Sequence, residues 1–207
     1  MRDPDQRVYV VDDDEAMRDS LVWLLESNGH AVEAFASAEA FLERWREEMH
    51  GCLVLDVRMP GMSGLELHER LGARGAALPV VFVTGHGDVP MAVAALKKGA
   101  VDFIEKPFSD KEMLRLVAGC LELEATRRAA RHRAAAVQRR VATLTERERE
   151  VMQLVVAGRL NKEIADDLGI SIKTVEVHRA RVMEKMEARS IAELVQAVVS
   201  GREPAAP

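Results

Sequence analysis

Five short apolar runs alternate with helical patterns over the first 124 residues, and this alternation limits the possible folds more than any other feature. The runs lie at 7–11, 31–35, 52–55, 79–83 and 101–104. The helical patterns lie at 14–27, 38–49, 64–73, 89–98 and 109–124. Strands that alternate with helices form a parallel sheet covered by helices on both faces, with right-handed crossovers. We therefore predict an α/β domain over residues 1–124.

Polar residues stand where the apolar runs end. Asp12 and Asp13 follow the first run, Asp56 ends the third, Thr84 follows the fourth and Lys106 follows the fifth. In open α/β sheets, ligands bind at the carboxyl ends of the strands, so these side chains are expected at one edge. Carboxylates gathered there repel one another unless a hard cation such as Mg²⁺ (or Mn²⁺) holds them.

This set of residues suggests phosphoryl transfer to a carboxylate. A divalent cation lowers the charge barrier to attack by Asp56 on phosphorus. Lys106 offers a point charge for a phosphate oxygen, and Thr84 offers a hydroxyl donor. Each signal alone has a simpler explanation, because acidic residues after a strand are usually helix caps, and we expect Asp14 to be one. Their joint occurrence in order at the strand ends is much more specific.

His86 and Asp88 could be interpreted as a catalytic pair, but we reject this interpretation. His86 follows Thr84 in a glycine-rich stretch, which is more typical of a loop residue than of a base.

Composition places the chain among cytoplasmic proteins with two functions. Residues 1–110 carry 11 basic and 20 acidic residues, whereas residues 111–207 carry 18 and 14. An acidic half followed by a basic half suggests that the second half binds nucleic acid. The two cysteines lack the spacing of a zinc or redox site. The N-terminus is polar and no apolar run is long enough to span a bilayer, so we expect a cytoplasmic location and no membrane partner.

Residues 125–142 form the predicted junction. This stretch is rich in alanine and arginine, and alanine is the best helix former, so we expect a helical linker. A weak heptad spacing leaves open whether the linker is a solvated connector or a dimeric coiled coil. Its basic residues could also contact DNA phosphates.

The basic half contains four helix signals, which predict an all-α four-helix domain over residues 143–207. Thr145 and Glu148 form a capping box, and Asn161 and Ser171 are expected to cap the next two helices. A last helix is expected from Ser190 to about Ser200. The helix, glycine turn and helix of 161–186 are typical of a helix-turn-helix, although an ordinary helical bundle has the same pattern.

The second helix of this motif is expected to enter the major groove. Basic and hydroxyl side chains there suit phosphates, arginine suits guanine, and glutamate can accept from cytosine. The residues expected to bind DNA are Asn161, Lys162, Lys173, Thr174, Glu176, Val177, His178, Arg179, Arg181 and Lys185.

Residues 5–124 resemble the receiver domain of two-component response regulators. The resemblance rests on four motifs: Val10-Val11-Asp12-Asp13, Asp56-Val57-Arg58-Met59-Pro60-Gly61-Met62-Ser63-Gly64, Thr84-Gly85-His86-Gly87 and Lys106-Pro107-Phe108. It implies a flavodoxin-like fold with a five-stranded parallel sheet in the order 2-1-3-4-5.

The same resemblance implies roles for single residues. Asp56 would take a phosphoryl group from a sensor histidine kinase. Asp12, Asp13, Asp56 and the backbone carbonyl of Arg58 would hold Mg²⁺. Thr84 and Lys106 would contact the phosphoryl group, the peptide before Pro107 would be cis, and Thr84 and Phe103 would be the switch residues. Phe103 stands where many members of the family carry tyrosine.

Residues 143–200 resemble the LuxR/NarL/FixJ-type DNA-binding domain, in particular its FixJ and StyR branch. The resemblance rests on Leu144-Thr145-Glu146-Arg147-Glu148, Asn161-Lys162-Glu163-Ile164-Ala165 and Thr174-Val175-Glu176-Val177-His178-Arg179. Glu176 stands where some relatives carry lysine, so their base preferences do not transfer.

Together the two resemblances imply a response regulator transcription factor. It would be phosphorylated on Asp56, dimerise, bind double-stranded promoter DNA and act on RNA polymerase. Its own chemistry would be limited to self-phosphorylation from a phosphodonor and slow autodephosphorylation. One alternative is a metal-dependent phosphohydrolase, but Arg58 stands where such an enzyme needs a carboxylate. The other is a DNA-binding scaffold that works without phosphate.

Overall fold

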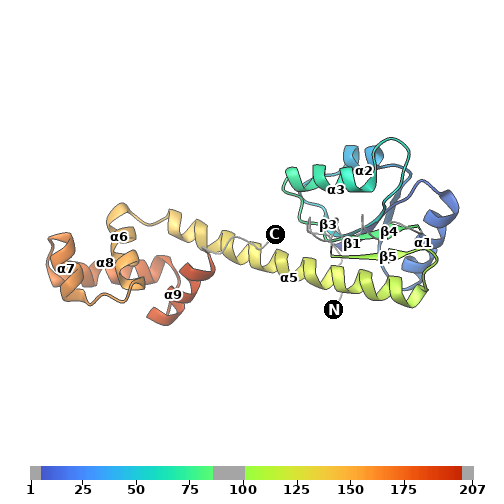
Figure 1. Ribbon diagram of the computed structural model, residues 1–207. Helices are drawn as coiled ribbons and strands as arrows, with labels where there is room; N and C mark the ends of the chain where they lie inside the picture. The colour runs from blue at the N-terminus through green and yellow to red at the C-terminus, as the bar shows by residue number, and fades with distance from the viewer. Residues whose placement is uncertain (1–5, 86–100, 202–207) are drawn as a thin grey trace. The chain divides into compact units, whose positions relative to one another are not determined.

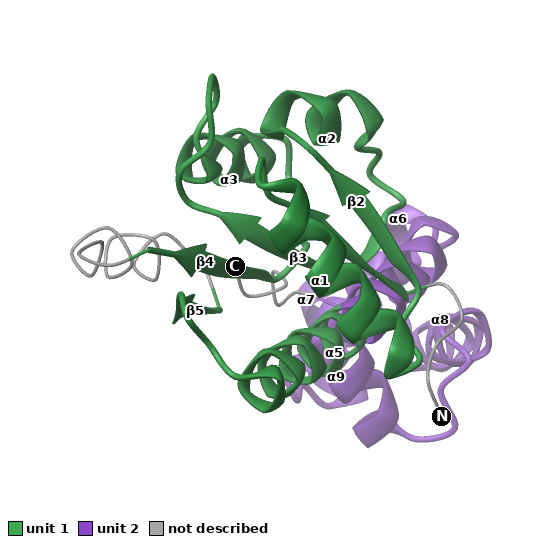
Figure 2. Ribbon diagram, turned by 90° about the vertical axis from the view of Figure 1, so that its right-hand side faces the viewer, with its two compact units in different colours: residues 1–127, 207 green, residues 128–206 purple. Residues whose placement is uncertain are grey.

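The computed structural model describes residues 6–85 and 101–201 (Figure 1). The chain forms two compact units, one up to Arg127 and one from Arg128 onward (Figure 2). Helix α5 (Asp110–Ala142) continues across this division. The helix predicted at 89–98, together with His86 and Asp88, lies outside the described residues.

The N-terminal unit is built on a parallel sheet in the order β2-β1-β3-β4-β5, which confirms the predicted topology. Its strands are β1 (Gln6–Val11), β2 (Val32–Phe35), β3 (His50–Asp56), β4 (Val80–Thr84) and β5 (Asp102–Glu105). The central strand β3 pairs with β1 through Val54 and Val10, and with β4 through Asp56 and Val83. The chain therefore places β3, which ends in Asp56, in the middle of the sheet.

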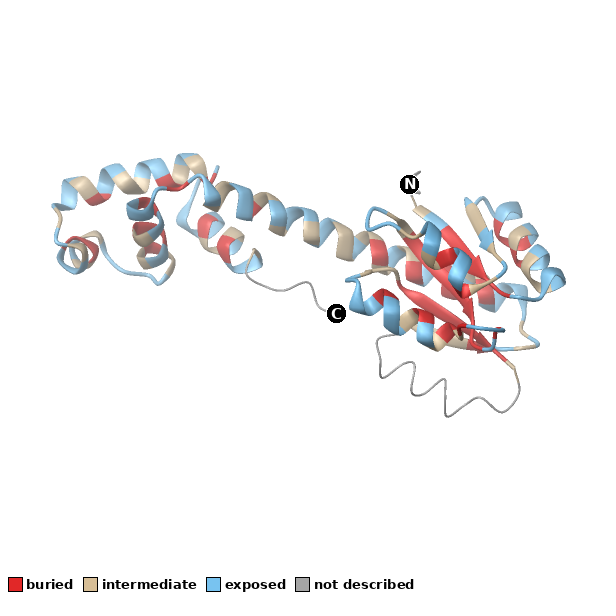
Figure 3. Cartoon of the chain, turned by 90° about the horizontal axis from the view of Figure 1, so that it is seen from above, coloured by how far each residue is buried: buried red, intermediate tan, exposed pale blue. Residues whose placement is uncertain are grey.

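Helices cover both faces of this sheet, which explains why its inner strands β3 and β4 are nearly continuous apolar runs rather than alternating ones. The covering helices are α1 (Glu15–Ser27), α2 (Ala38–Arg44), α3 (Gly64–Ala73) and the first half of α5. Leu53 and Leu55 of β3 lie in one apolar cluster with α2 and α3 residues. Cys52 and Val54 lie in the other cluster, with α1 and α5 residues. The inner strands β1, β3 and β4 are mostly buried (Figure 3), whereas the edge strands β2 and β5 are largely intermediate in burial.

Helix α1 begins and ends as its sequence predicts. The side chain of Asp14 accepts hydrogen bonds from the backbone N–H groups of Ala16 and Met17. Gly29 adopts a φ of 78°, and the N–H of His30 then donates to the carbonyl of Leu25. A left-handed residue after the last turn is a common helix end, and glycine adopts it without steric cost.

Helix α2 is shorter than predicted. The sequence predicted a helix over 38–49, but α2 ends at Arg44, where Trp45 takes an extended conformation with ψ of 137°. Trp45 and Met49 both pack against the apolar cluster beneath α2 and α3. Packing of these two side chains turns the backbone toward the start of β3, so tertiary contacts override the helical pattern.

The C-terminal unit consists of the end of α5 together with α6 (Glu146–Val156), α7 (Asn161–Leu168), α8 (Ile172–Lys185) and α9 (Ile191–Ser200). The capping box of Thr145 and Glu148 is confirmed, and so is the cap by Ser171. Ser190, where the last helix was expected to begin, is the cap of α9. Val137 of α5 is buried in the core of this unit. The last part of the predicted linker therefore packs with the helices that follow it.

The predicted cap of α7 is wrong. Asn161 is the first residue of the helix, and Leu160 occupies the cap position. Leucine has no side-chain oxygen to accept a backbone N–H, but the carboxylate of Glu163 accepts the N–H of Leu160 at 2.8 Å. The side-chain oxygen of Asn161 accepts instead from the guanidinium of Arg179.

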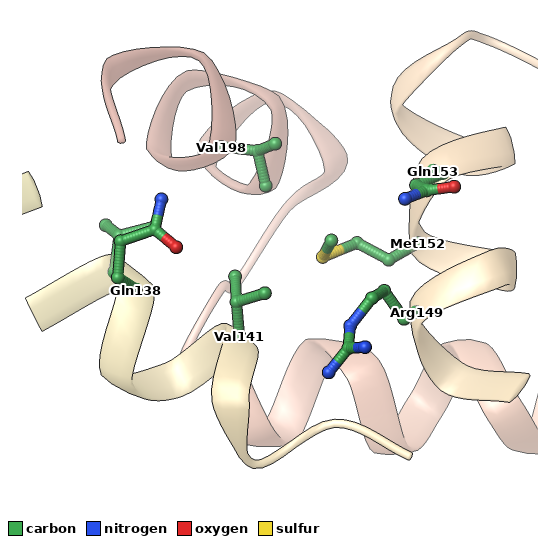
Figure 4. A pocket seen from close by; sticks show the side chains of 7 residues that line it. Gln138, Val141, Arg149, Met152, Gln153 and Val198 are labelled. Carbon is green, nitrogen blue, oxygen red and sulfur yellow. The ribbon is translucent and has the colours of Figure 1, made fainter. Parts of the chain in front are cut away.

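A cavity of about 110 Å³ lies between α5, α6 and α9 in the C-terminal unit (Figure 4). The side chains of Val141, Met152 and Val198 face it, and Arg149 reaches toward it from α6. Ligand pockets usually enclose about 300–1,000 Å³. This cavity is well below that range, so we regard it as a packing gap.

A buried ion pair joins α6 to the end of α8. The side chain of Glu148 is 2% exposed, and its Oε2 accepts hydrogen bonds from Lys185 Nζ at 2.6 Å and from the N–H of Thr145 at 2.9 Å. Lys185 Nζ also donates to the carbonyl of Thr143 at 3.1 Å. The hydrogen bond from Lys185 is the main reason that the pKa of Glu148 falls from 4.5 to about 2.

We expect the Glu148→Gln variant to lose about 2 kcal/mol of unfolding free energy, because a hydrogen bond between charged groups is lost. Because the folded-state pKa of Glu148 is lowered, its contribution is complete above pH 4.5 and is lost as the pH falls toward 2. The difference between wild type and variant, measured by urea unfolding followed by circular dichroism, should shrink over that range.

The matched control is Glu150→Gln on the same helix. Glu150 pairs with Arg147 at the surface, where both side chains are at least 40% exposed, so we expect a loss of at most about 0.5 kcal/mol. An equally large loss in this control, or a Glu148→Gln effect that does not change with pH, would contradict the argument.

Candidate functional site

Three carboxylates meet at the carboxyl edge of the sheet. Asp12 and Asp13 directly follow β1, and Asp56 is the last residue of β3. One oxygen from each of the three lies within 4.8 Å of the other two. Asp12 is 1% exposed and Asp56 is 8% exposed, whereas Asp13 faces solvent. The cluster therefore has a buried side and an open side.

The ammonium of Lys106 lies between the two buried carboxylates. Its Nζ is 3.0 Å from Asp12 Oδ2 and 3.0 Å from Asp56 Oδ2. Burial acts to lower the pKa of Lys106, but the hydrogen bonds to Asp56 and Asp12 outweigh it and raise the pKa above its ordinary value. Burial raises the pKa of Asp12, although the hydrogen bond from Lys106 opposes that rise. Lys106 thus stays charged and offsets part of the negative charge.

Backbone contacts fix the position of Asp56. The N–H of Val57 donates to the carbonyl of Val83, and the N–H of Gly64 donates to the carbonyl of Val57. A Cβ on Gly64 would lie 2.1 Å from the carbonyl oxygen of Asp56, so only glycine permits this approach. The N–H of Arg58 donates to Asp56 Oδ1 at 3.2 Å, which leaves Oδ2 to Lys106.

Thr84 and Phe103 lie on the two strands beyond Asp56. Thr84 ends β4, is 2% exposed, and its hydroxyl donates to the carbonyl of Gly85 at 3.2 Å. Phe103 of β5 is partly buried against the apolar cluster beneath α2 and α3. The peptide between Lys106 and Pro107 is cis, as the resemblance implied.

The structure therefore brings Asp12, Asp13, Asp56 and Lys106 together and places Thr84 at the end of the neighbouring strand. This confirms the expected meeting of side chains at one edge of the sheet. The metal, phosphate and switch roles of these residues stay predictions. Arg58 lies two residues after Asp56 in the loop, and the role of its carbonyl stays a prediction as well.

The residues predicted to bind DNA fall into two groups on α7 and α8. The first group is exposed and consists of Lys162, Lys173, Glu176, Val177 and Arg181. Four of its members follow one another along one side of α8, at the spacing of a helix face. This group forms the exposed face of α8, a name kept below for Lys173, Glu176, Val177 and Arg181.

The second group is partly used inside the unit. Arg179 donates to the side-chain oxygen of Asn161, which links α8 to α7. The hydroxyls of Thr174 and Ser171 lie 2.8 Å apart. His178 Nδ1 is buried with no hydrogen-bond partner within the described part of the chain. Lys185, at the far end of α8, is bonded to Glu148 and Thr143.

Sequence reasoning missed the internal use of Lys185. Glu148 lies 37 residues away in the chain, so the pairing follows from the packing of α6 on α8. The only available signal was the match of charges between a cap residue and a helix end, which many other pairs share.

Within residues 6–85 and 101–201, no helix is both long enough and apolar enough to cross a membrane.

Two family descriptions match the chain. The response regulator receiver domain matches residues 8–118, and the luxR family of bacterial regulatory proteins matches residues 142–198. The first match alone covers more than half of the chain.

Individual relatives match over nearly their whole length. The transcriptional regulatory protein FixJ of Azorhizobium caulinodans is 51% identical, over 96% of this chain and 94% of that protein. FixJ of Rhizobium meliloti is 49% identical, over 95% of this chain and 97% of that protein.

Two solved structures extend the likeness to both units. The response regulator StyR is 48% identical with a TM-score of 0.85, covering 94% of this chain and 98% of that chain. Full-length FixJ from B. japonicum is 45% identical with a TM-score of 0.58, covering 95% and 97%.

These matches favour neither a phosphohydrolase nor a scaffold, because these relatives are transcriptional regulatory proteins and response regulators. The chain belongs to the FixJ-type response regulators, in which a receiver domain is followed by a LuxR-family DNA-binding domain.

Proposed function

We propose that this regulator is switched by phosphorylation of Asp56, with a phosphoryl group from a sensor histidine kinase. The observation that carries the proposal is the position of Lys106 Nζ, 3.0 Å from both Asp12 and Asp56. An ammonium held there can bind an oxygen of a phosphoryl group on Asp56 without moving far.

The acidic cluster fits Mg²⁺ or Mn²⁺. Asp12, Asp13 and Asp56 offer hard oxygen ligands within 4.8 Å of one another, and we propose the carbonyl of Arg58 as a further ligand. Bound there, the cation supplies positive charge that offsets the charge developing on the transferred group. Three carboxylates and one ammonium leave an excess of two negative charges, which a dication would neutralise.

The transfer itself uses a carboxylate oxygen of Asp56. That oxygen forms a bond to phosphorus as the bond from phosphorus to the kinase histidine nitrogen breaks, and the histidine ring leaves as a neutral group after taking a proton. Lys106 then pairs with a phosphoryl oxygen. Thr84 turns its hydroxyl from Gly85 toward the phosphoryl group, and Phe103 moves with it.

The response is DNA binding by a homodimer. We propose a receiver over 1–124, a helical linker over 125–142 and a DNA-binding domain over 143–207, with promoter DNA and RNA polymerase as cytoplasmic partners. Burial of Val137 supports a DNA-binding unit that includes the end of α5.

The exposed face of α8 is proposed to enter the major groove. Within the described residues, its basic and glutamate side chains do not take part in the internal hydrogen bonds that hold Arg179 and Lys185. Lys162 at the start of α7 would contact phosphate. For Lys185 we propose a structural role through Glu148 in place of the DNA contact predicted from the sequence.

Full-length protein incubated with acetyl phosphate and Mg²⁺ should take up one phosphoryl group, and Asp56→Asn should lose the labelling by about 100-fold or more, since the attacking oxygen is gone. Phosphate-affinity gels and intact-mass spectra measure the product. Asp19→Asn, which removes an exposed carboxylate of α1, is the control and should label normally. Labelling of the Asp56→Asn variant at the wild-type rate would remove Asp56 from its role.

Arg181→Ala should weaken binding to a selected promoter fragment by about tenfold or more, because a side chain in the groove is lost. Lys185→Ala should lower the unfolding temperature but leave the affinity of the folded protein within about twofold. Fluorescence anisotropy at one stated salt concentration, with protein activated by beryllofluoride, measures both. If Lys185→Ala lost affinity while fully folded, Lys185 would be a DNA contact after all.

A further inference from the structure

A side chain of α2 holds the loop that follows Asp56. Glu39 lies in the first turn of α2, and its Oε1 accepts a hydrogen bond from the backbone N–H of Met62 at 2.8 Å. Met62 lies in the loop between β3 and α3, 23 residues further along the chain. The sequence gives no sign of this contact, because it depends on how α2 sits beside the loop.

The carboxylate also lies directly against the loop backbone. Gly61 adopts a φ of 75°, and a Cβ on this residue would be 2.8 Å from Glu39 Oε1. Glycine is therefore favoured at this position for two reasons, its left-handed backbone and the close approach of the carboxylate. Apolar packing supports the same arrangement, since Met59 and Met62 of the loop share a buried cluster with Phe41 of α2.

The rest of the loop is fixed at its two ends. At the start, the N–H of Arg58 donates to Asp56 Oδ1. At the end, Ser63 and Glu66 form the capping box of α3, and the N–H of Gly64 donates to the carbonyl of Val57. Glu39 adds a hydrogen bond between these ends, at Met62.

We propose that Glu39 is a positioning residue for the cation site. By holding Gly61 and Met62, it keeps the backbone near Arg58 in the conformation in which the Arg58 carbonyl can serve as a ligand. This inference rests on the proposed cation site at Asp12, Asp13 and Asp56. Glu39 itself is not a ligand, because its carboxylate is used by the loop backbone.

Three variants of the full-length protein separate positioning from electrostatics. Glu39→Ala removes the acceptor and the charge. Glu39→Gln removes the charge but keeps an oxygen that can accept the Met62 N–H. Glu43→Ala removes a similarly exposed charge one turn further along α2, and it leaves the loop contact in place.

The measurement is the dissociation constant for Mg²⁺, obtained by calorimetry, with Mn²⁺ paramagnetic resonance as a second probe. Melting curves of the metal-free proteins set a temperature at which every variant is folded. We expect Glu39→Ala to weaken Mg²⁺ binding about tenfold, which corresponds to one hydrogen bond to a charged group. Glu39→Gln and Glu43→Ala should stay within about twofold of wild type, because each retains the contact.

The outcomes are distinct. If Glu39→Ala binds Mg²⁺ as wild type does, or if Glu39→Gln loses as much affinity as Glu39→Ala, the positioning role is overturned while the cation site stands. If the wild-type protein itself binds neither Mg²⁺ nor Mn²⁺, the proposed cation site fails and this inference fails with it. A loss confined to Glu39→Ala supports the inference.

Discussion

The ammonium of Lys106 between Asp12 and Asp56 is the interaction on which the proposed function of the N-terminal unit depends. It joins the ends of β1 and β3 to the end of β5, and each of these strands arrives from a different part of the chain. Three carboxylates and one ammonium leave an excess of two negative charges in a site with a buried side. A dication balances that excess, whereas a phosphoryl group on Asp56 adds negative charge again. The proposed phosphorylation of Asp56 would therefore change the balance of charge at this edge of the sheet, where Thr84 ends the neighbouring strand.

The sequence predicted most of this edge because strong physical constraints act there. Strands covered on both faces must be continuously apolar, and the first polar residue after each run marks the end of the strand. Asp12, Asp56 and Thr84 were found in this way, whereas Lys106 follows the fifth run after Glu105. The helix caps by Asp14, Thr145 and Ser171 were predictable for a similar reason, since the hydrogen bonds are local and need specific side chains.

Features that depend on packing between distant elements were not predictable. Helix α2 ends at Arg44 because Trp45 and Met49 pack into the cluster below, and no local signal marks that end. Leu160, and not the predicted Asn161, occupies the cap position of α7, and the side chain of Asn161 instead accepts a hydrogen bond from Arg179 on α8. The contact of Glu39 with Met62 belongs to the same class. In each case the structure depends on a contact between side chains or backbone groups that lie on different elements of the fold.

Helix α5 shows how local and distant effects combine. It supplies Met113, Leu116, Val117 and Cys120 to the core of the N-terminal unit and Val137 to the core of the C-terminal unit. Between them, residues 125–136 contain no buried side chain. The helical state of this segment therefore rests on its alanine and arginine content and on the packed turns at either end. The composition that predicted a helical linker is thus the composition the segment needs, because burial of its side chains contributes little to its stability.

Some charged residues of α8 form bonds inside the unit, and others remain on its exposed face. At one end Lys185 meets Glu148, a buried carboxylate that needs a partner, and in the middle Arg179 meets Asn161. Such bonds fix the angle at which α8 packs against α6 and α7. The side chains left over, Lys173, Glu176, Val177 and Arg181, lie on the exposed face and are held in one orientation by that packing. The helix proposed to enter the groove gains this rigidity from an ion pair and hydrogen bonds on its other faces, so these internal bonds determine how the proposed contact surface is held.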